Sequence, residues 1–173
     1  MRIAINNGRW LDPANARDAV LNVYIEAGHV VGIGRPPDGF VPERCLDATG
    51  AIVIPGIVDL AAHLREPGQE HKASIASETQ AAAARGITTL CQPANTEPPI
   101  DSPATVELIK RLTATGSGVR VVTLGALTAG LKGRQLSDMA ALKQAGCVGV
   151  SNGLQPLADT TTMRRAMEYA ATF

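Results

Sequence analysis

Hydrophobic and polar positions follow two patterns along this chain. In residues 1–54, short Val- and Ile-rich segments alternate with polar residues and are separated by turn residues, which predicts β-strands. Residues 21–25 and 29–34 are expected to form a hairpin around the Glu-Ala-Gly turn between them. Residues 2–5 predict a strand that ends at the turn signal Asn-Asn-Gly, and residues 45–53 predict a further short strand region. We therefore expect a small β-rich domain over residues 1–54.

From residue 55 onward, strand and helix patterns alternate. Strands are expected at 57–64, 88–92, 119–127 and 147–151, and helices at 73–85, 102–115, 136–145 and 160–171. Gly86, Gly116 and Gly146 stand where helices should end, and Ser102 followed by Pro103 suits a helix start. Four βα units in a row predict a parallel sheet with right-handed crossovers.

The length of this second region suggests an incomplete barrel. A (β/α)8 barrel takes about 250 residues, so residues 55–173 are expected to hold the first half of a TIM-type barrel. The chain stops directly after a helix, and we expect it to be a truncated piece of a longer protein. Half a barrel would expose two strand edges, so association with a copy of itself is also expected.

Composition excludes several classes of protein. Hydrophobic residues make up 45% and charged residues 18%, as in an ordinary soluble globular protein. The 16 basic and 16 acidic residues cancel, and aromatics reach only 3%, which argues against a nucleic-acid partner. The longest apolar run is interrupted by Pro55, Asp59 and His63, which argues against a membrane span. Three cysteines without a Cys-x-x-Cys pair indicate neither a disulfide framework nor a thiolate zinc site, and they fit the cytoplasm.

The most informative stretch is residues 55–68, Pro-Gly-Ile-Val-Asp-Leu-Ala-Ala-His-Leu-Arg-Glu-Pro-Gly. An apolar run leaves one Pro-Gly turn and ends in a charged loop with another. This pattern is typical of a buried parallel strand that brings polar groups to one end of a sheet. Because side chains alternate along a strand, Asp59, Ala61, His63 and Arg65 are expected to share one face.

This stretch resembles the dihydroorotase branch of the amidohydrolase superfamily. In that family the strand ends His-x-His-x-Arg-Glu-Pro-Gly, the two histidines bind a zinc ion, and the arginine holds the substrate carboxylate. The second histidine corresponds to His63 and the arginine to Arg65, whereas Ala61 replaces the first histidine. The resemblance implies a β-sandwich segment before the barrel, joined to it at residues 47–50 and 55–56.

Two further segments continue the resemblance and depart from it. Residues 92–101 are similar to the family's Met-Pro-Asn-Thr-x-Pro segment, in which the asparagine, here Asn95, contacts the substrate carboxylate; the proline stands one place earlier, at Pro93. After the fourth strand the family has Ser-Asp-Asp-Gly-x-Pro with an aspartate as metal ligand, and Asn152 and Gly153 occupy those places. An amide is a weak zinc ligand and glycine offers no side chain.

Alternatives remain open for the residues that match. His63 is expected to be a hydrogen-bonded histidine in the barrel mouth rather than a metal ligand, because catalytic zinc usually takes three protein ligands. One interpretation of Arg65 and Asn95 is a substrate-binding remnant that grips a small carboxylate, since a guanidinium offers a bidentate fork. The alternative for Arg65 is a salt bridge to Glu66 or another loop acid, and for Asn95 an Asx-turn.

The resemblance and its departures together imply a function. We expect a non-catalytic dihydroorotase-like protein of pyrimidine biosynthesis, with no catalytic residue and no cofactor, zinc being the cofactor of active relatives. In some bacteria such proteins are partners of the aspartate transcarbamoylase catalytic subunit, which is the role expected here. Two alternatives stay open: an active zinc-dependent dihydroorotase or related cyclic-amide amidohydrolase completed by residues beyond this chain, and a carboxylate-binding sensor.

Overall fold

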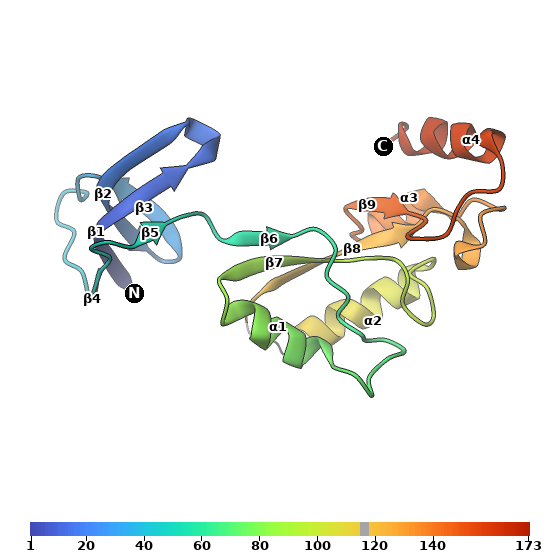
Figure 1. Ribbon diagram of the computed structural model, residues 1–173, viewed down its shortest axis with the longest axis horizontal. Helices are drawn as coiled ribbons and strands as arrows, with labels where there is room; N and C mark the ends of the chain where they lie inside the picture. Colours follow the sequence, from blue (N-terminus) through green and yellow to red (C-terminus); the bar gives the residue numbers. More distant parts are fainter. Residues whose placement is uncertain (115–117) are drawn as a thin grey trace. The chain divides into compact units, whose positions relative to one another are not determined.

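The computed structural model describes residues 1–114 and 118–173 of the chain. Contacts within the chain divide it into two compact units, Met1–Pro55 and Gly56–Phe173. Each unit has its own sheet, and helices alternate with strands in the second (Figure 1).

The first unit is built on one five-stranded sheet. Its strands are β1 (Arg2–Asp12), β2 (Arg17–Glu26), β3 (His29–Ile33), β4 (Arg44–Asp47) and β5 (Ile52–Val53), with a 3-10 turn η1 (Pro13–Asn15) between the first two. β1, β2 and β3 are antiparallel neighbours, while β4 and β5 both pair with β1 in parallel. The expected hairpin is confirmed as β2 and β3. The described residues of this unit form one sheet, so the second layer of a sandwich is not among them.

The turn predicted at residues 6–8 is wrong, because β1 continues through it. Asn7 has a left-handed φ of 63°, and the register with β2 shifts between Ile5 and Gly8, which makes a β-bulge. Neighbours on both sides supply the hydrogen bonds: the Asn7 N–H donates to Asn22 Oδ1 (2.9 Å), and the Ala48 N–H donates to the carbonyl of residue 6 (2.8 Å). Pairing with both neighbours therefore turns a local turn signal into a bulge.

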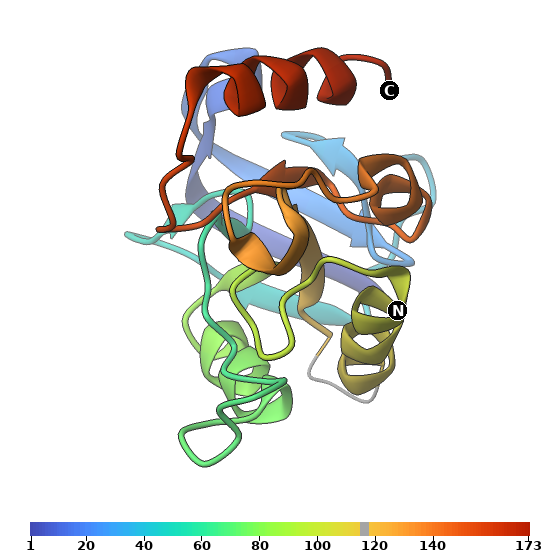
Figure 2. The ribbon, with the colours of Figure 1, turned by 90° about the vertical axis from the view of Figure 1, so that its right-hand side faces the viewer.

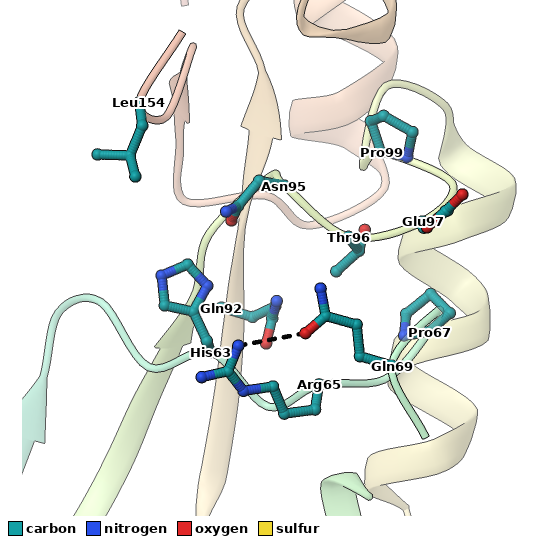
Figure 3. A pocket seen from close by; sticks show the side chains of 10 residues that line it. All are labelled: His63, Arg65, Pro67, Gln69, Gln92, Asn95, Thr96, Glu97, Pro99 and Leu154. Atoms are coloured by element: carbon teal, nitrogen blue, oxygen red, sulfur yellow. Dashed lines mark hydrogen bonds between the residues drawn. The ribbon is translucent and has the colours of Figure 1, made fainter. Parts of the chain in front are cut away.

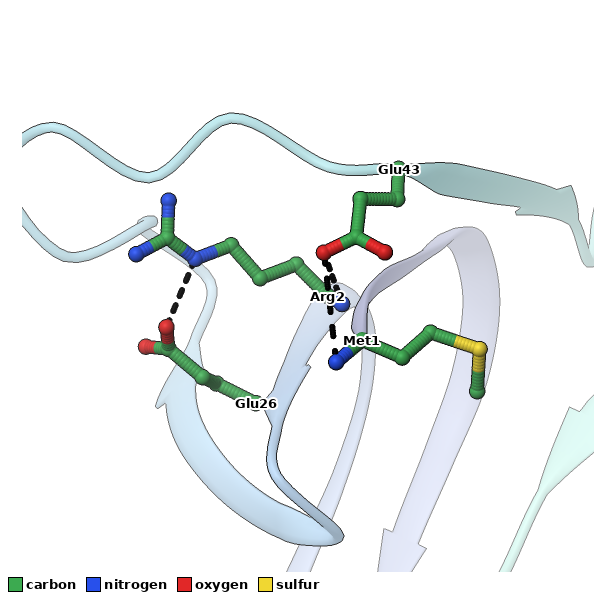
Figure 4. A network of polar contacts seen from close by, with 4 residues as sticks. All are labelled: Met1, Arg2, Glu26 and Glu43. Carbon is green, nitrogen blue, oxygen red and sulfur yellow. Dashed lines mark hydrogen bonds and ion pairs between the residues drawn. The ribbon is translucent and has the colours of Figure 1, made fainter.

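Polar contacts close one end of this sheet (Figure 4). Arg2 Nε lies 2.6 Å from Glu26 Oε1, and the backbone N–H of Arg2 donates to Glu43 Oε1 at 3.2 Å. The amino terminus of Met1 lies 3.9 Å from the same Glu43 oxygen. All these groups are substantially exposed, so each ion pair contributes at most about 1 kcal/mol.

The second unit contains a four-stranded parallel sheet in the order β6-β7-β8-β9 (Figures 1 and 2). Its elements, in chain order, are β6 (Ile57–Asp59), α1 (Ile75–Ala83), β7 (Ile87–Gln92), α2 (Pro103–Thr113), β8 (Arg120–Ala126), η2 (Ala129–Leu131), α3 (Met139–Gln144), β9 (Gly149–Ser151) and α4 (Thr160–Ala170). The mixed α/β class and the four successive βα units are confirmed, and the arrangement is that of a parallel half-barrel. No helix in the described part of the chain is both long enough and apolar enough to cross a membrane.

Local sequence explains where the helices begin and end. Ser74 begins α1 with a capping box, and Asp159 begins α4 by accepting the N–H of Thr162. Left-handed glycines follow α1 at Gly86 (φ 77°) and α3 at Gly146 (φ 105°), as predicted, because only glycine adopts this conformation without steric cost. The third predicted helix end, residue 116, lies outside the described residues.

α1, α2 and α3 pack apolar side chains against the sheet. α1 and α2 lie side by side beneath β7 and β8 (Figure 1). The buried side chains of this core are Leu64, Ile75, Ala82, Leu90, Ala94, Ile100, Val106, Ile109, Ala126, Leu131, Leu142 and Cys147. Ala94 and Ile100 belong to the loop after β7, so this loop is anchored in the core at both ends.

The first strand of this sheet is shorter than expected: β6 ends at Asp59 instead of residue 64. Beyond it, the Asp59 side chain accepts the N–H of Ala61 (3.0 Å), and the N–H of Leu64 donates to the side chain of Gln92 (2.8 Å). Side-chain acceptors thus take the N–H groups of Ala61 and Leu64, while the N–H of Ala62 still donates to the carbonyl of Cys91 (2.9 Å) in β7. Arg65 takes a left-handed φ of 67°. The strict alternation expected for residues 59–65 therefore does not apply.

Candidate functional site

A cavity of about 620 Å³ lies where the strands of the second unit end (Figure 3). It is lined by the segment after β6, the segment that begins at the last residue of β7, and one residue after β9. The lining residues are His63, Arg65, Pro67, Gln69, Gln92, Asn95, Thr96, Glu97, Pro99 and Leu154. Carboxyl ends of parallel strands are where α/β barrels carry their working residues.

Arg65 reaches into this cavity beside an amide rather than an acid. Its Nη1 donates to Gln69 Oε1 at 3.2 Å, an oxygen that also accepts from Lys72 Nζ at 3.2 Å. Glu66 is engaged elsewhere, because its Oε2 accepts the N–H of Ile75 (2.8 Å) at the start of α1. Among the described residues Arg65 forms no ion pair, so the salt bridge considered from sequence is absent there and the guanidinium can still meet an anion.

His63 and Asn95 face the same cavity as Arg65 (Figure 3). Both side chains are exposed, and within the described part of the chain neither makes a side-chain hydrogen bond. The described residues thus supply no partner for an Asx-turn at Asn95 or for the ring of His63, and the hydrogen bond expected for that ring stays a prediction. An imidazole, a guanidinium and a primary amide are thus all open to solvent in one cavity, a combination suited to a small anion.

Gln92 is a site residue that the sequence interpretation missed. It ends β7 and lines the cavity, yet only 2% of its surface is exposed. Its Oε1 accepts the N–H of Leu64, and its Nε2 donates to the carbonyl of Pro93 at 3.2 Å. A polar residue at the end of an apolar run, directly before a proline, is the sequence signal that could have identified it.

The three positions where metal ligands were expected to be lost lie outside the cavity lining. Ala61 is exposed, and its N–H is bound to Asp59. Asn152 is buried and its amide is directed at the loops after β8 and β9 instead of the cavity. Gly153 has a left-handed φ of 60°, and a Cβ added there would lie 3.9 Å from Cβ of Asn95.

The side chains present do not fit a catalytic zinc ion. The described residues contain no group of three or more His, Cys, Asp and Glu side chains that could hold a metal. Among side chains that commonly bind metals, those of His63 and Glu97 line the cavity, which is also lined by the cationic Arg65. Catalytic zinc usually takes three protein ligands, and His63 and Glu97 fall short of that number. We therefore derive no chemical step through a metal on these residues.

Near the cavity, the pKa values of Glu70 and Cys91 are shifted, and each shift has an identifiable cause. The N–H of Gly68 donates to the carboxylate of Glu70 at 2.8 Å and thereby lowers the pKa of Glu70. Burial, with a smaller effect from the charge of Asp59, raises the pKa of the Cys91 thiol in β7. Cys91 therefore stays protonated at neutral pH, as expected of a small core residue rather than a nucleophile.

Comparison with known proteins agrees with this fold. The family model described as "Dihydro-orotase-like" matches residues 50–173. A "Dihydroorotase-like protein" of Pseudomonas aeruginosa is 47% identical over the full chain, which covers 41% of that protein, and a "Dihydroorotase" of Syntrophotalea carbinolica is 42% identical, with 40% of it covered. The chain thus spans about two fifths of the length of these relatives.

Solved structures share the fold. An L-hydantoinase (dihydropyrimidinase) from Arthrobacter aurescens superposes with a TM-score of 0.81 over 98% of this chain and 38% of its own, at 19% identity. A dihydroorotase superposes with a TM-score of 0.60 over 99% of this chain and 48% of its own, at 16% identity. At such low identity these structures show the fold alone. With the family match over residues 50–173, the chain belongs to the dihydroorotase-like family.

Proposed function

We propose that this chain is a non-catalytic member of the dihydroorotase-like family that serves in pyrimidine biosynthesis. The observation that supports this proposal is the set of side chains at the strand ends: Ala61, Asn152 and Gly153 stand where active relatives are expected to have metal ligands. When bound, zinc supplies an activated water and polarises the carbonyl to be attacked. The described residues present no alternative donor group for it.

The cavity retains the features needed to bind a small carboxylate. The Arg65 guanidinium can form a bidentate, charge-assisted contact, and the Asn95 amide can donate a further hydrogen bond from the neighbouring loop. Gln69 keeps the guanidinium in the cavity through its 3.2 Å hydrogen bond. We propose that these residues bind a ligand such as carbamoyl aspartate without turning it over.

We further propose that the chain is a structural partner of the aspartate transcarbamoylase catalytic subunit in the cytoplasm, with self-association as a second contact. This role comes from the family resemblance. Exposed apolar side chains around β6 support an interface, because Ile57, Val58 and Leu60 are 45%, 53% and 75% exposed. Large apolar side chains in solvent on an edge strand favour contact with a further chain or segment.

A second candidate is an active dihydroorotase whose metal ligands come from residues beyond this chain. The relative from Syntrophotalea carbinolica favours it, since that protein is named dihydroorotase, is 42% identical and is much longer.

Turnover and co-purification separate the two candidates. We expect no hydrolysis of dihydroorotate and no cyclisation of carbamoyl aspartate, with or without added zinc, and we expect the chain to co-purify with the aspartate transcarbamoylase catalytic subunit in a fixed mass ratio. A Val58→Lys variant should lose that partner while keeping its helical circular dichroism. Zinc-dependent turnover would contradict the first proposal and support the second, and recovery of this chain without the subunit would refute the partnership.

Ligand binding without catalysis has its own assay. Dihydroorotate, carbamoyl aspartate or orotate should raise the melting temperature of the wild-type chain but not of Arg65→Ala, because a ligand that binds only the folded state stabilises it by mass action. Unchanged melting with all three compounds at millimolar concentration would remove the carboxylate site from the proposal.

A further inference from the structure

Two primary amides are buried where strands of the second unit end. Gln92 is the last residue of β7 and is 2% exposed; Asn152 directly follows β9 and is 9% exposed. A buried amide must satisfy both its oxygen and its nitrogen, so its partners are held in fixed positions. Neither residue is explained by carboxylate binding alone.

Gln92 joins the segment after β6 to the end of β7. Its oxygen accepts the N–H of Leu64, which is itself 1% exposed, and its nitrogen donates to the carbonyl of Pro93. The segment it holds contains His63 and Arg65, two of the residues that line the cavity. The Gln92 amide therefore fixes the backbone segment that carries the Arg65 side chain.

Asn152 joins the loop after β8 to the loop after β9. Its Oδ1 accepts the hydroxyl proton of Thr128 at 2.6 Å, and its Nδ2 donates to the carbonyl of Gln155 at 2.9 Å. The Thr128 hydroxyl in turn accepts the N–H of Gly133 at 2.9 Å, and its residue is 0% exposed. Four backbone and side-chain groups are thus satisfied by one connected network.

We propose that Gln92 and Asn152 act as amide crosspieces, which hold the strand-end loops in place without a metal ion. A metal bound at the mouth of a barrel would tie together side chains from different strands; here an uncharged amide makes the connection at each of two places. This inference rests on the proposed absence of a metal from the site. It adds that the shape of the mouth is built into the chain's own hydrogen bonds.

An aspartate at position 152 could not make both hydrogen bonds that the Asn152 amide makes. An aspartate there would keep an oxygen for Thr128 but would place a second oxygen against the carbonyl of Gln155, where Asn152 now donates. A buried carboxylate next to a carbonyl oxygen is repelled and lacks a partner. An acid at this position therefore loses the bond to Gln155 within the loop after β9 and buries an unpaired charge beside the contact with Thr128.

Hydrogen exchange measured by mass spectrometry on the whole chain tests this inference. In Thr128→Val, we expect peptides that cover residues 127–136 and 152–157 to lose protection by about tenfold or more, since the hydrogen bond between the two loops is gone. In Asn152→Asp, which loses the bond to Gln155, we expect the loss in the peptides that cover residues 152–157. Thr128→Ser keeps the hydroxyl and should retain protection. Peptides from α1 and α2 should be unchanged in all variants, which separates local loosening from global unfolding.

The role of metal is tested in the same samples by adding zinc chloride. Protection of the two loops in the wild-type chain should not change with zinc. The inference is overturned if Thr128→Val keeps wild-type protection, or if zinc increases the protection of these loops in the wild-type chain. Turnover of carbamoyl aspartate in a parallel sample would refute the proposed function, whereas the exchange of the Thr128 variants reports on the crosspiece by itself.

Discussion

Replacing Gln92 with methionine should lower the free energy of unfolding, although the two side chains are similar in size. The two side chains have similar length, so the change removes hydrogen bonds while leaving little empty space. The buried N–H of Leu64 loses its acceptor and the carbonyl of Pro93 loses its donor. Each unsatisfied buried group costs about 1–3 kcal/mol, and the added apolar burial of methionine returns about 1–2 kcal/mol. The two groups together cost about 2–6 kcal/mol, so the net loss lies between about 0 and 5 kcal/mol, and we expect a value near the midpoint, about 2–3 kcal/mol.

Urea unfolding followed by circular dichroism at 222 nm reports on the second structural unit, which contains Gln92, because the α-helices of the described residues all lie in that unit. The matched control is Gln69→Met, which changes another glutamine of the same cavity whose partners, Arg65 and Lys72, are exposed. The control should lose less than about 1 kcal/mol. If the two variants were equally stable to within about 0.5 kcal/mol, the buried amide would not be holding the segment after β6.

Three further results are expected. Arg65→Ala should weaken binding of carbamoyl aspartate by about 10–100-fold in calorimetry, the value of a charge-assisted hydrogen bond, and equal affinity would contradict the carboxylate site. Gly125→Ala should cost about 1–3 kcal/mol in urea unfolding, because the new Cβ would lie 2.8 Å from Leu142 Cδ1, and wild-type stability would show that Leu142 moves freely. The N–H of Thr162 lowers the pKa of Asp159 in the folded chain, so the cap of α4 stabilises above the carboxyl's ordinary pKa and is lost as pH falls through the lowered value. Helical circular dichroism at acidic pH should therefore fall less in Asp159→Asn than in the wild-type chain, and identical pH profiles would exclude the cap.

Much of the architecture follows from local sequence. Alternation of apolar strands with amphipathic helices predicts the four βα units, since each helix is also marked by a cap or a following glycine. The hairpin of β2 and β3 follows from its turn. The segments that carry His63, Arg65 and Asn95 could be assigned to strand ends from their order along the chain, and the structure does bring these three residues to one cavity.

Other features depend on partners far away in the chain, and the sequence alone did not reveal them. The segment after β6 does not continue as a regular strand up to residue 64, where the side chain of Gln92 accepts the N–H of Leu64, 28 residues before it. The expected turn at residues 6–8 is a bulge because strands on both sides supply hydrogen bonds. Asn152 faces away from the cavity because Thr128, 24 residues earlier, donates to it. Local patterns set backbone preferences, whereas the direction of a buried amide is set by whichever group the fold brings within hydrogen-bonding distance.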